Sequence, residues 1–248
     1  MKKIFETEIM SNFEVAEKIY RLEMYAPELA AMSRAGQFIE VQLAEDFTLR
    51  RPFGVSSTKN DTVKIFYRVV GQGTKFLSRR NFGEILNVLG PLGNGFESGV
   101  DGKVLLVGGG MGLAPLLCAA EQSKSVDVLI GGKTADEVTF WLDEFAEDVG
   151  EIFVTTDDGS FGEKGFVTNF LPEILQAGNY SAVYTCGPEI MMRNVAMEVL
   201  ANEIPCRVSF ERRMACGLGA CLSCSIDTAH GRKKVCKDGP VFDAQEVF

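Results

Sequence analysis

The sequence predicts a multidomain β and α/β chain in three parts: a small antiparallel β-barrel, an α/β domain with a parallel sheet, and a short cysteine-bearing segment. Three observations predict this order. Short alternating apolar and polar runs fill residues 1–99, buried-strand and helix patterns alternate over 100–210, and four of the seven cysteines fall within 211–248. Strands without long intervening helices favour an antiparallel barrel. Alternating strands and helices favour a right-handed parallel sheet that is covered on both faces.

Composition and charge narrow the class of protein. The 248 residues are 46% hydrophobic and carry a net charge of −9, which allows two ordinary domains with a substantial core. No basic block is present, so nucleic acid binding is disfavoured. The chain meets charge too early for a signal peptide, and no apolar run approaches the roughly 20 residues of a membrane span. We therefore expect a soluble, cytoplasmic protein.

The predicted barrel contains three clear strand patterns, over residues 13–24, 36–43 and 63–70. Apolar and polar residues alternate in each, at least in part, and Gly, Pro and Asn-Asp punctuate the intervals. The single histidine, His230, has no nucleophile elbow near it, which disfavours a Ser-His-Asp hydrolase.

Two stretches of the predicted barrel suit a phosphate-bearing aromatic cofactor. Residues 50–57, RRPFGVSS, offer guanidinium groups, a flat ring and small residues along one strand. Residues 71–77, GQGTKFL, offer glycines and a hydroxyl where a strand can turn into a short helix, whose N–H groups would face a pyrophosphate. Each pattern alone is more often only a turn, but the two together favour a cofactor site.

The α/β part begins with an apolar run over 104–107, a loop Gly108-Gly109-Gly110-Met111-Gly112, and a helix pattern over 113–121. Short apolar runs of this kind are typical of buried parallel strands. The remaining patterns predict strands at 126–130, 151–155, 180–185 and 207–210, and helices around 136–146, 167–176 and 188–202.

Three of the predicted strand ends are small or polar: the glycine loop, TTDDGS at 155–160 and TCGPE at 185–189. The carboxyl ends of parallel strands lie at one edge of a sheet, where nucleotide phosphates bind. The glycine loop is not a Gly-x-Gly-x-x-Gly fingerprint, because Pro115 takes the third glycine's place counted from Gly110. Alone it could be only a tight turn, but three such ends predict a dinucleotide crevice.

The cysteines Cys216, Cys221 and Cys224 follow the C-x4-C-x2-C spacing, and Cys236 comes after a gap of eleven residues. The first three match the plant-type spacing of a [2Fe-2S] cluster, and the glycines between the first two let the backbone aim N–H groups at sulfur. A four-cysteine zinc site is the alternative, although structural zinc usually shows two separated C-x2-C pairs. Disulfides are less favoured, because the count is odd and no secretory segment opens the chain.

With its parts in this order, the chain resembles the ferredoxin-NADP reductase superfamily and, within it, the electron-transfer subunits of NAD-dependent, type B dihydroorotate dehydrogenases. The likeness runs almost end to end. Its most specific parts are MACGLGAC at 214–221 and VCKDGPVF at 235–242. The remaining cysteines Cys118 and Cys206 match no motif and are expected to be buried.

The resemblance implies an FAD-binding barrel over 1–99, an NAD-binding domain over 100–210 and a [2Fe-2S] domain over 211–248, with the chemistry carried by the cofactors. It implies Arg51 at the FAD pyrophosphate and Phe53 beside the isoalloxazine, with further FAD contacts from Pro52, Gly54, Phe66, Tyr67, Arg68, Gly73 and Thr74. Gly54 stands where the family motif usually has serine. It implies NAD contacts from Gly108, Gly109, Gly110, Met111, Gly112, Thr156, Asp157, Cys186, Gly187 and Pro188, and cluster ligands Cys216, Cys221, Cys224 and Cys236.

The function that the resemblance implies is that of an oxidoreductase component in pyrimidine biosynthesis. Electrons from dihydroorotate would pass through FMN in a separate catalytic subunit, then the cluster, FAD and NAD⁺, in a heterotetramer of two plus two. Nicotinamide moves two electrons as hydride and the cluster accepts one at a time, so a flavin between them is needed. An FMN-binding TIM barrel takes about 250 residues by itself, so this chain alone is not expected to oxidise dihydroorotate.

Alternatives remain at this level. The acidic pair Asp157-Asp158 favours NAD over NADP, although Lys133 could serve a 2′-phosphate. A reductase subunit that serves a ferredoxin, a hydrogenase or a sulfite reductase would share the same three parts. A zinc-stabilised nucleotide-binding regulator is the candidate from a different class.

Overall fold

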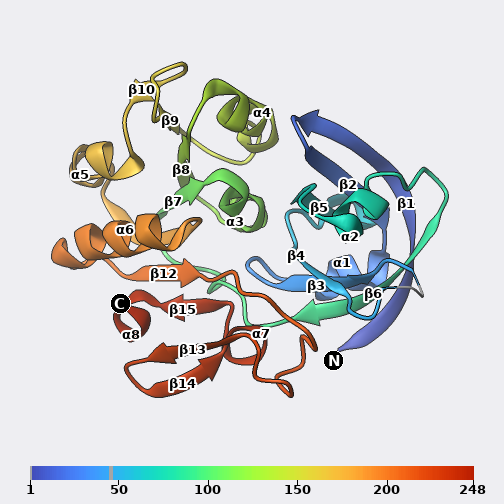
Figure 1. The fold of residues 1–248 in the computed structure, drawn as a ribbon. Coiled ribbons are helices and arrows are strands. Elements are labelled where there is room, and N and C mark those ends of the chain that lie inside the picture. Colours follow the sequence, from blue (N-terminus) through green and yellow to red (C-terminus); the bar gives the residue numbers. More distant parts are fainter. Residues whose placement is uncertain (1, 45–46) are drawn as a thin grey trace.

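The computed structural model describes residues 2–44 and 47–248, and Figure 1 shows two sheets side by side with the C-terminal segment beneath both. The first sheet contains β1 (Lys3–Ala16), β2 (Ile19–Tyr25), β3 (Phe38–Gln42), β4 (Arg51–Gly54), β5 (Thr62–Arg68) and β6 (Ile85–Leu92). Its order is β4-β3-β6-β1-β2-β5, and all neighbours are antiparallel. A bridge between Ser57 and Lys64 joins the two ends of the sheet, so the predicted antiparallel barrel is confirmed.

One predicted strand of the barrel is wrong. The stretch 13–24 is a hairpin, because β1 ends at Ala16 and β2 begins at Ile19. Lys18 makes the turn with φ 59°, and its N–H donates to Glu14 Oε1 at 2.7 Å. The alternation continues across the turn, so periodicity alone did not reveal it. The other two predicted strands are β3 and β5, and β6 was not predicted. Short helical segments complete the barrel: α1 (Pro27–Met32), η1 (Lys59–Asp61) and α2 (Gln72–Leu77).

The second sheet is parallel apart from its last strand. It contains β7 (Lys103–Gly109), β8 (Val126–Gly132), β9 (Ile152–Thr156), β10 (Glu163–Lys164), β11 (Tyr180–Cys186), β12 (Cys206–Ser209) and β15 (Val241–Asp243). The order is β10-β9-β8-β7-β11-β12-β15, and only β15 runs antiparallel to its neighbour. The strands at the centre are apolar on both faces, since Leu105, Leu106 and Val107 are all fully buried.

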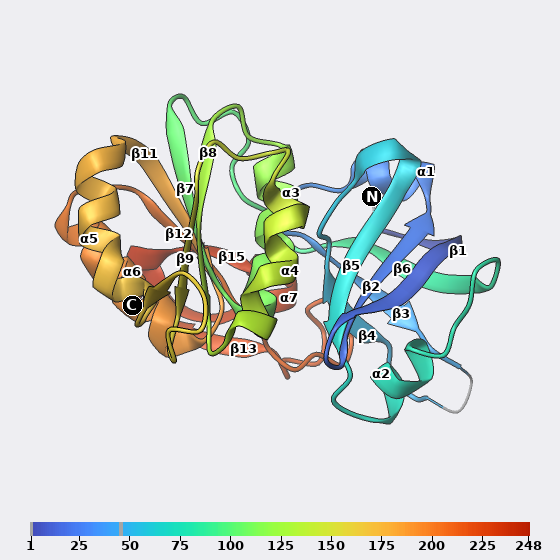
Figure 2. The same ribbon diagram turned by 90° about the horizontal axis from the view of Figure 1, so that it is seen from above.

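Helices cover both faces of this sheet, as predicted. They are η2 (Gly110–Gly112), α3 (Leu113–Glu121), α4 (Ala135–Phe145), α5 (Val167–Gly178) and α6 (Glu189–Ala201). Figure 2 shows α3 and α4 on the face toward the barrel and α5 and α6 on the other. Among the described helices, none has the length and apolar character needed to cross a membrane.

The two lobes meet where α4 packs against the barrel. The ring of Trp141 lies 4.7 Å from that of Phe66 on β5. Beside it, Glu144 accepts from Arg21 at 2.8 Å and from Lys64 at 2.9 Å. Burial of the rings and pairing of the carboxylate fix the orientation of one lobe on the other.

The C-terminal segment is attached to both lobes. It contains β13 (Ser225–Thr228), β14 (Gly231–Lys234), α7 (Val235–Asp238), β15 and α8 (Ala244–Val247). Strand β15 extends the parallel sheet through β12, whereas Asn94, after the barrel, donates its N–H to Gly239 O at 2.6 Å. The segment therefore holds its cysteines beneath the junction of the lobes.

Candidate functional site

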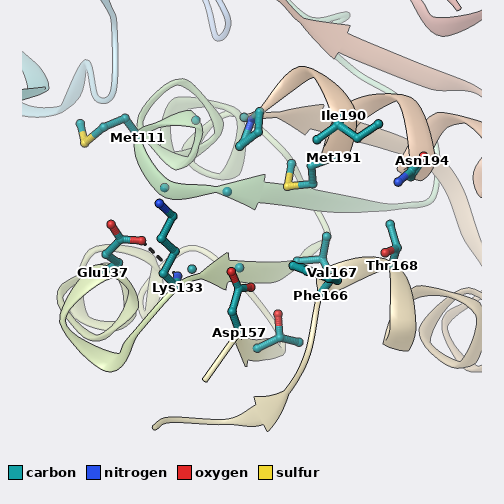
Figure 3. A pocket seen from close by; sticks show the side chains of 18 of the residues that line it. Met111, Lys133, Glu137, Asp157, Phe166, Val167, Thr168, Ile190, Met191 and Asn194 are labelled. Carbon is teal, nitrogen blue, oxygen red and sulfur yellow. Dashed lines mark hydrogen bonds between the residues drawn. The ribbon is translucent and has the colours of Figure 1, made fainter. Parts of the chain in front are cut away.

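A cavity of about 660 Å³ lies at the carboxyl ends of β7, β8, β9 and β11. Figure 3 shows Met111 from the glycine loop, Phe166, Val167 and Thr168 at the start of α5, and Ile190, Met191 and Asn194 on α6 around it. The structure thus brings the three predicted strand ends together. The predicted residues that line this cavity are Arg68, Gly109, Gly110, Met111, Gly112, Asp157, Gly187 and Pro188.

Sequence reasoning missed the side chains that α5 and α6 contribute. Ile190, Met191 and Asn194 line the cavity from α6, and Thr168 lines it from α5. Their positions in the sequence could have indicated that they line the cavity, because each stands in the first or second turn of a helix that follows a strand end. The close approach of α6 explains why residue 109 is a glycine, since a Cβ on Gly109 would lie 2.7 Å from Met191 Sδ.

Three residues predicted to contact the nucleotide do not line this cavity. Gly108 lies behind it, where a Cβ would stand 2.5 Å from Leu113 Cδ2. The Thr156 hydroxyl donates to Phe161 O at 2.7 Å and accepts from Phe161 N at 3.2 Å, so it holds the following loop. Cys186 lines a second cavity instead. Their nucleotide contacts stay predictions.

The second cavity, of about 350 Å³, lies between the barrel and the α/β lobe. Its predicted residues are Arg51, Pro52, Phe53, Gly54, Phe66, Tyr67, Arg68, Thr74, Met111 and Cys186. The rings of Phe53 and Tyr67 are 5.7 Å apart, and the Tyr67 hydroxyl donates to Asn12 Oδ1 at 2.9 Å. An apolar wall with aromatic rings and the guanidinium groups of Arg51, Arg68 and Arg212 suits a planar cofactor that carries phosphates.

Gly73 does not line the second cavity but positions a residue that does. A Cβ on Gly73 would stand 2.9 Å from Arg51 Nε and 2.7 Å from Leu43 Cδ1. The start of α2 therefore packs directly on the Arg51 side chain. Thr74 stabilises this start, because its Oγ1 accepts from Val70 N at 2.9 Å and from Gly71 N at 3.2 Å.

Three residues line both cavities: Arg68, Met111 and Glu211. Arg68 pairs across the lobes with Glu137 Oε1 at 3.4 Å. Burial raises the pKa of Glu211 above its ordinary value. Glu211 was not predicted, although it directly follows the buried end of β12 and Phe210. The two cavities are therefore adjacent and share their walls.

The four clustered cysteines meet as two pairs. The N–H of Cys221 points to Cys216 Sγ at 3.5 Å, and the N–H of Cys236 points to Cys224 Sγ at 3.4 Å. Burial, the Cys224 sulfur and the charge of Cys216 raise the pKa of Cys236 to about 12. Hydrogen bonds from Ser223 and from Cys216 lower the pKa of Cys221 to about 6.

The loop between the first two cysteines is folded around sulfur. The N–H groups of Leu218 and Ala220 each point to Cys216 Sγ at 3.4 Å. Gly217 and Gly219 have φ of 59° and 85°, which glycine adopts without strain. Amide groups aimed at a thiolate are the hydrogen bonds that tune iron-sulfur potentials.

The four sulfurs provide the two pairs of thiolates that a [2Fe-2S] centre needs. All seven cysteines are free. Among the described residues, no group of three or more His, Cys, Asp or Glu side chains converges as a site for a single metal ion.

Comparisons with known proteins identify the family. Residues 211–248 match the sequence model described as the iron-sulfur cluster binding domain of dihydroorotate dehydrogenase B. The electron transfer subunit of dihydroorotate dehydrogenase B (NAD(+)) from Caldanaerobacter subterraneus subsp. tengcongensis is 39% identical over 252 residues, covering 100% of both chains. The chain belongs to this family of electron transfer subunits. Its counterpart from Clostridium perfringens is 40% identical over 98% of this chain and 97% of its own.

Solved structures agree with this family fold. A chain from the structure of the NADH-dependent reduced ferredoxin-NADP oxidoreductase, a flavin-based electron-bifurcating protein, has a TM-score of 0.87 and 33% identity, covering 98% of this chain and 89% of its own. The ferredoxin NADP⁺ reductase from Neisseria gonorrhoeae has a TM-score of 0.64 and 18% identity, covering 80% and 91%. The second likeness shows the fold alone. The family of electron transfer subunits thus shares its barrel and parallel sheet with the ferredoxin-NADP reductases.

Proposed function

We propose that this chain is the electron-transfer subunit of an NAD-dependent dihydroorotate dehydrogenase, which carries electrons through a [2Fe-2S] cluster and FAD to NAD⁺. The carrying observation is that Arg68, Met111 and Glu211 line both cavities. Arg212 and Met214, which lead into the cysteine loop, line the second cavity as well. Family membership supports the same function.

For the cluster, we assign Cys216, Cys221, Cys224 and Cys236 as ligands. Two pairs of thiols with N–H groups aimed at Cys216 and Cys224 fit its needs. When bound, the three cofactors supply the conversion between two-electron hydride transfer and one-electron transfer. The chain's own residues bind them, orient them and restrict water.

For FAD, we assign the second cavity. Arg51, which α2 positions through Gly73, would hold the pyrophosphate. Phe53 and Tyr67 would lie along the isoalloxazine, with Gly54 in contact with Pro115, since a Cβ there would be 3.4 Å from Pro115 Cβ. Cys186 and Glu211 would close this site on the side of the α/β lobe.

For the nucleotide, we assign the first cavity and NAD. The glycine loop provides backbone approach to a pyrophosphate, and Asp157 at the end of β9 would accept hydrogen bonds from ribose hydroxyls. The carboxylates Glu137 and Asp157 would oppose the 2′-phosphate of NADP. Of the lining cations Lys133 and Arg68, Arg68 already pairs with Glu137.

For the partner, we propose an FMN-containing catalytic subunit that oxidises dihydroorotate, in a heterotetramer of two plus two in the cytoplasm. Residues 2–44 and 47–248 form the antiparallel barrel, the parallel-sheet lobe and the cysteine segment, whereas a TIM barrel takes about 250 residues by itself. The cysteine segment, beneath both lobes, would face this partner.

A second candidate is a reductase subunit of the NADH-dependent reduced ferredoxin-NADP oxidoreductase kind. The structural likeness over 98% of the chain favours it. The match of residues 211–248 to the dihydroorotate dehydrogenase B domain favours the first candidate.

The deciding experiment uses the purified chain with and without a dihydroorotate-oxidising flavin subunit. We expect stoichiometric FAD, iron and acid-labile sulfide, NADH oxidation with artificial acceptors by the chain alone, and dihydroorotate-dependent NADH formation only with the partner. A colourless, zinc-loaded chain would refute the proposal. Ferredoxin-dependent turnover without dihydroorotate activity would favour the second candidate.

A further inference from the structure

Glu40 is a buried carboxylate without an evident structural need. It lies on β3 between Ile39 and Val41 and is 1% exposed. Its Oε1 has no hydrogen-bond partner among residues 2–44 and 47–248. A buried polar group without a partner costs free energy, so an apolar residue here would serve the barrel better.

The side chain of Glu40 lies between the segments assigned to FAD and to the cluster. In the sheet, Glu40 stands opposite Pro52 of β4, next to Arg51 and Phe53. On its other side it contacts the cysteine loop, because a Cβ on Gly217 would lie 2.5 Å from Glu40 Cδ, 2.6 Å from Oε1 and 2.7 Å from Oε2. The unpartnered oxygen therefore faces the loop that follows Cys216.

Arg50 provides the counter-charge. Its Nη1 donates to Glu40 O at 3.3 Å and to Asn87 O at 3.1 Å, and its Nη2 donates to Gln42 Oε1 at 3.0 Å. Burial raises the pKa of Glu40, the charge of Arg50 opposes this, and the charge of Cys221 adds to it.

We propose that Glu40 is a positioning residue for the cluster: its carboxylate seats Gly217 against the flavin-binding barrel and lowers the reduction potential of the cluster. The inference rests on the cluster ligands proposed above. Seating Gly217 fixes the turn whose N–H groups converge on Cys216 Sγ. A negative charge beside this turn disfavours the added electron, because local charge and hydrogen bonds set cluster potentials.

The first test replaces the charge while it keeps the shape. In Glu40→Gln we expect iron, sulfide and FAD contents equal to wild type, and a cluster midpoint potential shifted to a more positive value in an EPR-monitored redox titration in alkaline buffer. The matched control is Glu6→Gln, which removes an exposed carboxylate bonded to Asn87 at 2.5 Å. We expect the control to leave the potential at the wild-type value. An unchanged potential in Glu40→Gln, or an equal shift in both variants, would overturn the charge effect.

The second test addresses the contact with Gly217. We expect Gly217→Ala to lower the iron content and broaden the EPR signal, since the new Cβ meets the Glu40 carboxylate. Combining it with Glu40→Ala should restore part of the iron content, a non-additivity that marks direct contact. Additive losses in the double variant would refute the seating role.

These outcomes separate this inference from the proposed function. A wild-type chain without iron and sulfide would refute the cluster itself. If wild type carries its full iron and sulfide content but substitution of Glu40 leaves the cluster potential and the EPR signal unchanged, only the role of Glu40 is refuted.

Discussion

Gly112 packs directly against the backbone of Cys186: a Cβ on Gly112 would lie 2.4 Å from the Cys186 carbonyl oxygen. The contact joins the glycine loop after β7 to the end of β11. The two residues line adjacent cavities, Gly112 the first and Cys186 the second. The spacing between the two sites therefore depends on the missing side chain at Gly112.

Gly112→Ala is expected to weaken NADH binding. Overpacking of a tight contact costs about 1–3 kcal/mol, which corresponds to about 5- to 150-fold in affinity. NADH titration and KM with an artificial acceptor measure it, with FAD content as the folding check. The control is Gly71→Ala, because Gly71 has no atom within 4 Å of a Cβ position. Equal effects of both substitutions on NADH affinity would contradict the assignment.

Cys221→Ala is expected to abolish cluster assembly and leave FAD bound. The loss of one of four thiolates leaves one iron with a single protein ligand, whereas the barrel does not depend on the loop. Iron, sulfide and flavin analysis of the purified variant measures it. Cys118→Ala is the control, because Cys118 is buried in α3 far from the loop in sequence. Undiminished iron in Cys221→Ala would refute the ligand assignment.

Arg51→Gln is expected to weaken FAD binding. A hydrogen bond to a charged group contributes about 1.5–3 kcal/mol, so the affinity should fall about 10- to 150-fold. Reconstitution of the flavin-free protein, followed by flavin fluorescence, gives the affinity. Arg79→Gln, at an exposed position after α2, is the control. If both variants bind FAD equally well, Arg51 does not contact the cofactor.

Glu144→Gln is expected to destabilise the contact between the lobes in a pH-dependent way. Burial acts to raise the pKa of Glu144, but the hydrogen bonds and charges of Arg21 and Lys64 outweigh it and leave the pKa below the ordinary value of 4.5. A depressed folded-state pKa contributes stability that is complete above 4.5 and is lost as the pH falls through the folded-state pKa.

Denaturant unfolding of wild type and Glu144→Gln measures this contribution. At neutral pH we expect wild type to be more stable by about 1.5–3 kcal/mol. The difference should shrink as the pH falls below 4.5. Both proteins carry the same cofactors, so the acid lability of a cluster cancels in the difference. A difference that is constant with pH would contradict the pairing.

Strong local patterns predicted the elements of the α/β lobe well. The apolar helix over 113–121 is α3 with the same bounds, and the run at 126–130 lies inside β8. The barrel was predicted less completely. The hairpin at Lys18 was not predicted, because the alternation of apolar and polar residues continues across its turn. Strand β6 was not predicted, because it pairs with residues that are distant in sequence.

The sequence by itself determined the local patterns that predict cofactor binding. These are the cysteine spacing, the glycine loop and the strand that begins with Arg51, and each indicates its chemistry without knowledge of the fold. Only the tertiary structure decided how these segments meet. It placed Glu211 between the two cavities and Glu40 against Gly217. Gly73 and Gly108, which were predicted to contact cofactors, lie behind the cavity walls and support them. The physical reason is that such contacts join residues far apart in the chain, and their closeness depends on the packing of two lobes and a C-terminal segment rather than on any local preference.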